Sequence, residues 1–88
     1  MSYDVKFSDN ALKSLSKIDP YQAKIILAWI EKNLKNCADP RLHGKPLVGG
    51  KRSYWLYRVG SYRIIADIRD DVVLIGIVNV AHRREAYR

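Results

Sequence analysis

Residues 53–81 read SYWLYRVGSYRIIADIRDDVVLIGIVNVA, and this stretch decides the fold. It holds three runs rich in β-branched and aromatic residues: Ser53–Val59, Ser61–Arg69 and Val72–Ala81. The pairs Gly60-Ser61 and Asp70-Asp71 separate the runs, and two-residue connections of this kind predict antiparallel hairpins. Val72–Val80 is apolar almost without a break, which is typical of a central strand buried on both faces.

The N-terminal half predicts one more strand and a pair of helices. Ser2–Phe7 alternates apolar and polar residues, as a half-buried strand does. Ser8 is a favourable N-cap for a helix over Asp9–Ile18, and Asp19-Pro20 starts a second helix. The apolar residues of the second helix recur at helical spacing along one stripe: Ala23, Ile26, Leu27, Ile30 and Leu34.

The four residues Gly44, Pro46, Gly49 and Gly50 predict an irregular loop before the β-rich half. We therefore expect one α+β domain over residues 1–88, in the order β-α-α-β-β-β. Its N-terminal helical hairpin packs on a mainly antiparallel four-stranded sheet. Cys37 is the only cysteine, which excludes an intramolecular disulfide. Neither a signal peptide nor an apolar run of roughly 20 residues is present, so a cytoplasmic protein without membrane contact is expected.

The net charge of +7 is unevenly distributed along the chain. Residues 1–40 hold six lysines and no arginine against five acids, a net charge of +1. Residues 41–88 hold two lysines and eight arginines against four acids, a net charge of +6. Arginine suits bidentate contact with phosphate and stacking on bases. The charge pattern therefore favours a nucleic-acid partner over an anionic membrane or an acidic protein.

Strand alternation gathers arginine on one face of the predicted hairpin. Arg58 shares a face with Tyr54 and Leu56, and Arg63 begins the matching face of the next strand. If the helices cover the other face, the arginine face is exposed, and arginines beside aromatic rings suit single-stranded RNA. A plainer interpretation is that these arginines are only exposed strand charges, while Trp55 and Tyr57 pack in the core.

Metal and nucleotide motifs are absent from the sequence. One cysteine and two histidines, His43 and His82, offer no recognisable ligand spacing, and no glycine-rich phosphate loop occurs. No cofactor is therefore expected, and any chemistry must come from arginine, lysine, histidine and tyrosine.

Two motifs together resemble the RelE/ParE toxin superfamily, nearer its RelE branch. They are Trp-Leu-Tyr-Arg-Val-Gly-Ser-Tyr-Arg-Ile-Ile at 55–65 and His-Arg-Arg-Glu-Ala-Tyr at 82–87, behind an N-terminal strand and a helical hairpin. The resemblance covers essentially the whole chain. It implies a toxin of a type II toxin–antitoxin system, a ribosome-dependent endoribonuclease that cleaves mRNA in the A site. The implied mechanism needs no metal: the 2′-hydroxyl attacks the adjacent phosphate and leaves a 2′,3′-cyclic phosphate.

The resemblance also assigns roles to individual residues. Arg63 and Arg83 match the family arginines that stabilise the charged phosphate, and Tyr87 matches its terminal tyrosine. Arg58 is a supporting phosphate contact, and His82 is the candidate general base. Further RNA contacts are expected from Lys51, Arg52, Lys45 and His43. The best-known members place two lysines where this chain has Trp55-Leu56-Tyr57, so the residues that transfer protons stay open; Lys51 is the second candidate after His82.

The resemblance implies one partner and leaves two other functions open. An acidic, partly disordered antitoxin similar to RelB is expected to wrap the domain and to cover the arginine face or displace the C-terminal tail. One alternative is a ParE-like inhibitor of DNA gyrase that does not cleave RNA. The other is an RNA-binding relative without catalytic activity, which the missing lysines keep open.

Overall fold

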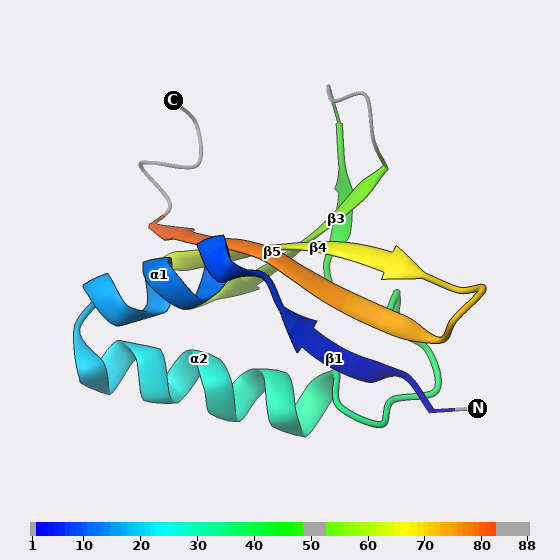
Figure 1. The fold of residues 1–88 in the computed structure, drawn as a ribbon, viewed down its shortest axis with the longest axis horizontal. Coiled ribbons are helices and arrows are strands. Elements are labelled where there is room, and N and C mark those ends of the chain that lie inside the picture. The colour runs from blue at the N-terminus through cyan, green and yellow to red at the C-terminus, as the bar shows by residue number, and fades with distance from the viewer. Residues whose placement is uncertain (1, 49–52, 83–88) are drawn as a thin grey trace.

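The computed structural model describes residues 2–48 and 53–82. The elements follow the order β1 (Asp4–Phe7), α1 (Asp9–Lys17), α2 (Pro20–Asn33), β2 (Lys45–Leu47), β3 (Tyr54–Val59), β4 (Tyr62–Arg69) and β5 (Leu74–His82). They form one sheet of order β1-β5-β4-β3-β2, in which β1 runs parallel to β5 and every other pair is antiparallel (Figure 1). The α+β class and the helical hairpin are confirmed.

The expected four-stranded sheet is wrong in one respect, because a fifth strand forms inside the predicted loop. Lys45 pairs with Leu56 and Leu47 pairs with Tyr54, which makes β2 an edge strand beside β3. Pro46 has no N–H to donate, but an edge strand needs hydrogen bonds on one side only. Three residues are also too few to show an alternating pattern, so the sequence signal was that of a loop.

The two hairpins differ in how they turn. Val59 pairs with Tyr62 across Gly60-Ser61, which confirms the two-residue connection there. The β4–β5 connection is longer than predicted and occupies residues 70–73, so β5 begins at Leu74. Val73 has a positive φ of 53° in this turn, and Val72 is exposed rather than buried in a central strand.

Both predicted helix caps form, and the first one ties α1 to the sheet. The Ser8 hydroxyl oxygen accepts a hydrogen bond from the Ala11 N–H at 3.0 Å and donates one to the Val78 carbonyl at 2.7 Å. Val78 is the extra residue of a β-bulge, because Ile65 pairs with Asn79 while Ala66 pairs with Ile77. The start of α1 is therefore held against the irregular point of β5.

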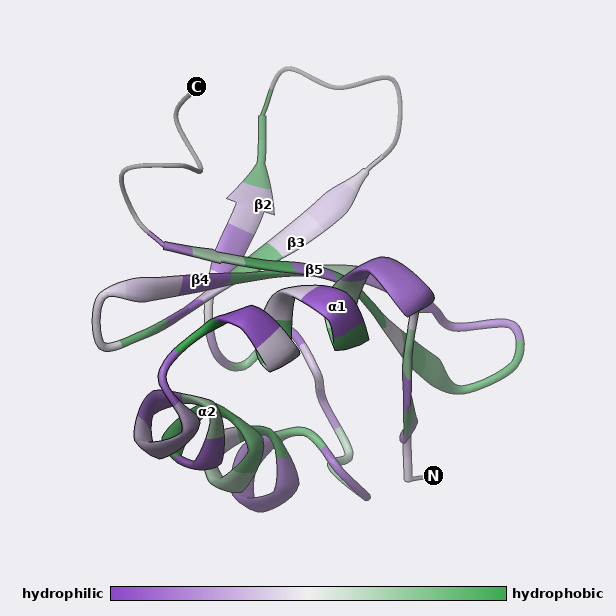
Figure 2. Ribbon diagram, turned by 60° about the vertical axis from the view of Figure 1, so that its left-hand side comes forward, coloured by the Kyte–Doolittle hydropathy of each residue, from purple (hydrophilic) through white to green (hydrophobic). Residues whose placement is uncertain are grey.

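The helices pack on one side of the sheet, which Figure 2 views nearly edge-on. The core between them is formed by the buried residues Ala11, Leu15, Ile26, Ile30, Leu34, Tyr57, Val59, Ile64, Ala66, Ile75, Ile77 and Val80. Leu27 belongs to the predicted apolar stripe of α2 but is 43% exposed. No helix in the described part of the chain is both long and apolar enough to cross a membrane.

The segment between α2 and β2 is anchored to β3 on the helix side of the sheet. The Tyr57 hydroxyl donates a hydrogen bond to the Pro40 carbonyl at 2.5 Å, and the Trp55 indole N–H donates one to the His43 carbonyl at 2.6 Å. Gly44 follows with a φ of +78° and lies directly against the backbone of Leu56. These contacts fix where β2 begins.

Candidate nucleic-acid interface

Two arginines lie directly opposite each other on neighbouring strands. Arg58 of β3 pairs in register with Arg63 of β4. Their strand neighbours Tyr57, Val59 and Ile64 belong to the core against the helices. Because successive side chains alternate between faces, both arginines project from the face that the helices leave open. That the two arginines share one face was predicted from the sequence.

The two arginines differ in exposure, and here one expectation is wrong. Arg58 is exposed, whereas Arg63 is only 3% exposed, although the whole arginine face was expected to be open. Arg63 lies on an inner strand, flanked by Arg58 on β3 and Ala81 on β5. A buried guanidinium has little freedom to reorient, so Arg63 is a fixed positive charge and Arg58 a more mobile one beside it.

Lys45 adds a third cation at the edge of this face. It pairs with Leu56, which is two residues from Arg58 on the same face of β3. Lys45, Arg58, Leu56 and Gly44 line one open pocket of about 300 Å³. The pocket therefore has an apolar floor at Leu56 and a cationic rim.

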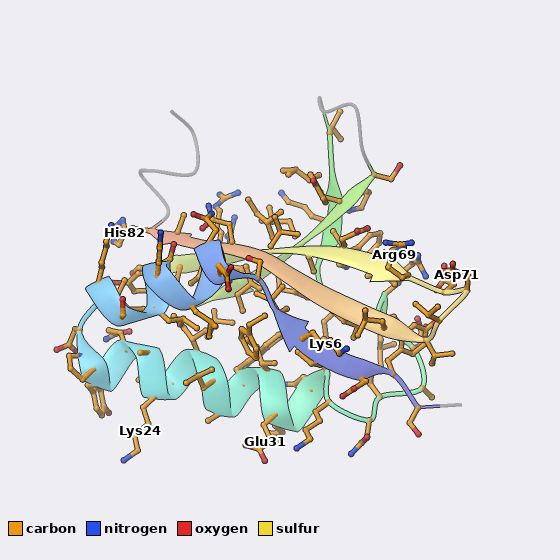
Figure 3. The ribbon with its side chains drawn as sticks, viewed as in Figure 1. Lys6, Lys24, Glu31, Arg69, Asp71 and His82 are labelled. Carbon is orange, nitrogen blue, oxygen red and sulfur yellow. The ribbon has the colours of Figure 1, made fainter. Side chains whose placement is uncertain are left out.

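Charge on the open face is separated between its two ends. At the end near His82, no ion pair within residues 2–48 and 53–82 involves Lys45 or Arg58. At the opposite end Arg69 lies 3.8 Å from Asp71 and 4.0 Å from Asp67, and Figure 3 shows Arg69 and Asp71 far from His82. Lys45 and Arg58 can therefore meet an anion at one end of this face, whereas Arg69 at the other end is balanced by two carboxylates.

The two predicted histidines lie away from the arginine pair. His82 pairs with Tyr62, and their rings meet edge to face at 5.3 Å. Since Tyr62 packs against the core, the His82 ring lies on the helix side of the sheet. The His43 ring contacts Trp29 at 5.8 Å, also on that side. The structure thus groups Arg58, Arg63 and Lys45 but does not bring either imidazole to them. The general-base role of His82 stays a prediction.

A second ionic cluster, which sequence reasoning missed, ties the chain together at the other end of the sheet. Arg41 donates two hydrogen bonds to Asp70, at 3.1 and 3.0 Å, and the Tyr3 hydroxyl donates a third at 2.6 Å. The hydrogen bonds from Arg41, and to a smaller extent that from Tyr3, lower the pKa of Asp70. The hydrogen bond between Tyr3 and Asp70 also raises the pKa of Tyr3. No local pattern marks this cluster, since Tyr3 and Asp70 are 67 residues apart.

Comparison with known proteins decides the family. Residues 5–87 match the family described as the ParE toxin of type II toxin–antitoxin systems. The chain belongs to this toxin family. It is 33% identical to a RelE-like toxin protein of Escherichia coli, over 98% of this chain and 88% of the relative. It is also 32% identical to Toxin RelG of Mycobacterium tuberculosis, over 100% of this chain and 99% of the relative.

The toxin fold is matched just as fully in three dimensions. A chain of the M. tuberculosis toxin–antitoxin complex RelBE2 superposes with a TM-score of 0.83 at 28% identity, covering 94% of this chain and 100% of that one. The resemblance to the RelE/ParE superfamily is therefore confirmed. Four residues to which the resemblance assigns toxin functions, Lys51, Arg52, Arg83 and Tyr87, lie outside the described residues, and their roles stay predictions.

Proposed function

We propose that this toxin is a RelE-type mRNA interferase that cleaves mRNA in the ribosomal A site and so inhibits translation. The observation that carries the proposal is the Arg58–Arg63 pair, which lies in register on the open face of the sheet, with Arg58 exposed and Arg63 held in place beside it. Its relatives named RelE-like toxin and RelG support the same branch. Guanidinium groups are suited to the bidentate contacts that a phosphate offers.

The proposed reaction requires only nucleic-acid atoms and protein side chains. The 2′-oxygen attacks the adjacent phosphorus, the bond from phosphorus to the 5′-oxygen breaks, and a 2′,3′-cyclic phosphate and a 5′-hydroxyl result. Negative charge gathers on the non-bridging oxygens in the transition state, where Arg63 and Arg83 supply positive charge and Arg58 supports them. Tyr87 is assigned to the base beside the scissile phosphate, and Lys51, Arg52, Lys45 and His43 to further RNA contacts.

The toxin is proposed to be held inactive by a cognate antitoxin. The M. tuberculosis relative is found in a toxin–antitoxin complex, and this chain matches all of that toxin chain. Residues 41–88 carry a net charge of +6, so an acidic antitoxin would be attracted to this half. We propose that this antitoxin, similar to RelB and partly disordered when free, covers the arginine face or displaces the C-terminal tail.

The test uses two arginines that share one face but differ in their surroundings. Arg58 has no described ion pair, whereas Arg69 is balanced by Asp67 and Asp71. Purified toxin is added to ribosomes programmed with a defined mRNA, and the cleavage rate and 3′ ends are measured. Arg58→Ala should slow A-site cleavage about tenfold or more, on the scale of a lost charge-assisted contact to phosphate. Arg69→Ala should leave the rate unchanged.

Supercoiling by DNA gyrase is measured in parallel, because the matching family model is described as ParE toxin. Gyrase inhibition without A-site cleavage would overturn the interferase proposal in favour of the gyrase alternative. If the toxin binds ribosomes or RNA but neither cleaves mRNA nor inhibits gyrase, the protein is an RNA-binding relative without catalytic activity. Equal cleavage rates for Arg58→Ala and Arg69→Ala would show that the Arg58–Arg63 pair does not contribute to cleavage.

A further inference from the structure

We propose that Lys45 is the general acid of the cleavage reaction, donating its proton to the 5′-oxygen as that oxygen leaves. This inference rests on the proposed function and deepens it, because it names a proton donor for the same site. It depends on β2, the edge strand that carries Lys45.

Sheet register places Lys45 in reach of a phosphate held by the arginine pair. Lys45, Leu56 and Ile65 form one row of paired residues across the open face, and Arg58, Arg63 and Ala81 form the next. With strands about 4.8 Å apart and about 3.4 Å per residue, the Lys45 Cα lies about 8 Å from that of Arg58 and about 12 Å from that of Arg63. Long lysine and arginine side chains converge on one group across such spacings.

The pocket supports the same convergence independently of the register. Lys45 and Arg58 line one cavity of about 300 Å³, so both groups border the same volume, and Arg63 is the register partner of Arg58. The floor of the cavity is the buried side chain of Leu56, which is 5% exposed. A leaving oxygen in this cavity meets an ammonium group at the rim over an apolar surface, where proton donation and charge pairing are stronger than in water.

Among the described residues that line this pocket, Lys45 is the one whose side chain can donate a proton. Arginine keeps its proton in proteins and therefore stabilises charge without transferring protons. Leu56 and Gly44 have no proton to give, and the His82 ring lies on the other side of the sheet against Tyr62. The ammonium of Lys45 can donate one of its three protons to the 5′-oxygen, leaving a neutral amine that solvent reprotonates, while the 2′-hydroxyl proton goes to a separate base.

The deciding experiment compares two mRNAs that differ in one atom. One carries the natural 5′-oxygen at the cleavage point, and the other carries a bridging sulfur in its place. A thiolate is a far better leaving group than an alkoxide, because thiol pKa values lie near 8.5, and it needs no proton from the enzyme. Lys45→Gln should slow cleavage of the oxygen substrate on programmed ribosomes by about 100-fold, the lower range for general acid catalysis, and slow the sulfur substrate far less, by the loss of an RNA contact alone.

Two further variants distinguish loss of the proton donor from loss of positive charge and from a general effect of removing a lysine. Lys45→Arg keeps the positive charge but transfers no proton, so it should be as slow as Lys45→Gln on oxygen and as fast as wild type on sulfur. Lys24→Gln removes an exposed lysine of α2 that points away from the sheet in Figure 3, and it should match wild type on both substrates. Thermal unfolding followed by circular dichroism establishes that each variant is folded.

The outcomes are distinguishable. Absence of A-site cleavage by the wild-type toxin would overturn the proposed function and this inference with it. Normal cleavage of the oxygen substrate by Lys45→Gln would overturn the inference alone. Equal slowing on oxygen and sulfur would assign Lys45 to phosphate binding and end its role as an acid. Much greater slowing on oxygen than on sulfur, for Lys45→Gln and Lys45→Arg alike, supports the inference.

Discussion

Replacing Gly44 with alanine perturbs the point where the anchored segment enters β2. A Cβ built on Gly44 would lie 2.3 Å from the Leu56 carbonyl oxygen and 2.9 Å from both the Trp55 indole nitrogen and Tyr57 Cδ1. The first of these atoms belongs to the backbone of β3, which cannot move without disturbing the sheet. The residue also has a φ of +78°, a conformation that side chains disfavour.

Two costs add in this variant. The left-handed conformation costs roughly 1–2 kcal/mol for a residue with a Cβ, and overpacking of a well-packed site typically costs about 1–3 kcal/mol. We therefore expect Gly44→Ala to lower the free energy of unfolding by about 2–5 kcal/mol, out of a total of about 5–15 kcal/mol for a domain. For a chain of this size each 1 kcal/mol lowers the melting temperature by roughly 4–8 °C.

Gly60→Ala is the matched control, because Gly60 has a similar φ of +59° but nothing within 4 Å of its built Cβ. It should lose only the conformational part, about 1–2 kcal/mol. Urea unfolding followed by tryptophan fluorescence measures both variants. Equal losses in the two variants would refute the argument, since they would show that contact with β3 contributes nothing beyond backbone strain.

Three other changes test the anchors and the site. Tyr57→Phe should cost about 1–3 kcal/mol in urea unfolding, because it leaves the buried Pro40 carbonyl without its hydrogen bond. Asp70→Asn should lower the free energy of unfolding at neutral pH. The difference in that free energy from wild type should shrink as the pH falls below about 4, the ordinary carboxyl pKa. The pKa of Asp70 is depressed in the fold, so its contribution is present above the unfolded pKa and is lost as the pH falls through the folded one. His82→Gln should slow cleavage by far less than the roughly 100-fold expected for a general base, because its ring lies on the helix side.

Each of these variants has a contradicting result. Tyr21→Phe removes a hydroxyl from a residue that is 68% exposed, and a loss as large as that of Tyr57→Phe would show that the hydrogen bond is unimportant. If the difference in unfolding free energy between Asp70→Asn and wild type stays the same as the pH falls through the acid range, the depressed pKa of Asp70 does not contribute to stability. A loss of about 100-fold or more in His82→Gln would instead support His82 as the general base.

The elements with strong local signals could be predicted from the sequence. Ser8 and Asp19 cap the helices as expected, and the Gly60-Ser61 turn sets the register that brings Arg58 opposite Arg63. These features depend on neighbours in sequence, so a reading of spacing and turn chemistry suffices. The family resemblance was found in the hairpin motif at 55–65 and in the motif at 82–87.

What could not be predicted depends on contacts between distant segments. β2 is too short to show a pattern and exists because Gly44 and the anchored segment place it against β3. The burial of Arg63 follows from the inner position of β4, which strand order alone decides. The bulge at Val78 likewise involves a distant segment, because its carbonyl accepts a hydrogen bond from the hydroxyl of Ser8, the N-cap of α1.

The two faces of β3 link the stability of the fold to the proposed chemistry. Trp55 and Tyr57 point to the helix side and hold the carbonyls of His43 and Pro40, while Leu56 and Arg58 point to the open side and form the pocket. The same strand therefore fixes where the segment ahead of Lys45 runs and where the arginine pair lies. Loosening the helix-side anchors should misplace Lys45 without touching Arg58. We accordingly expect Tyr57→Phe to slow cleavage of the oxygen substrate more than that of the sulfur substrate, although the Tyr57 side chain is fully buried. Equal slowing on both substrates would show that the anchor supports the whole face rather than the proton donor.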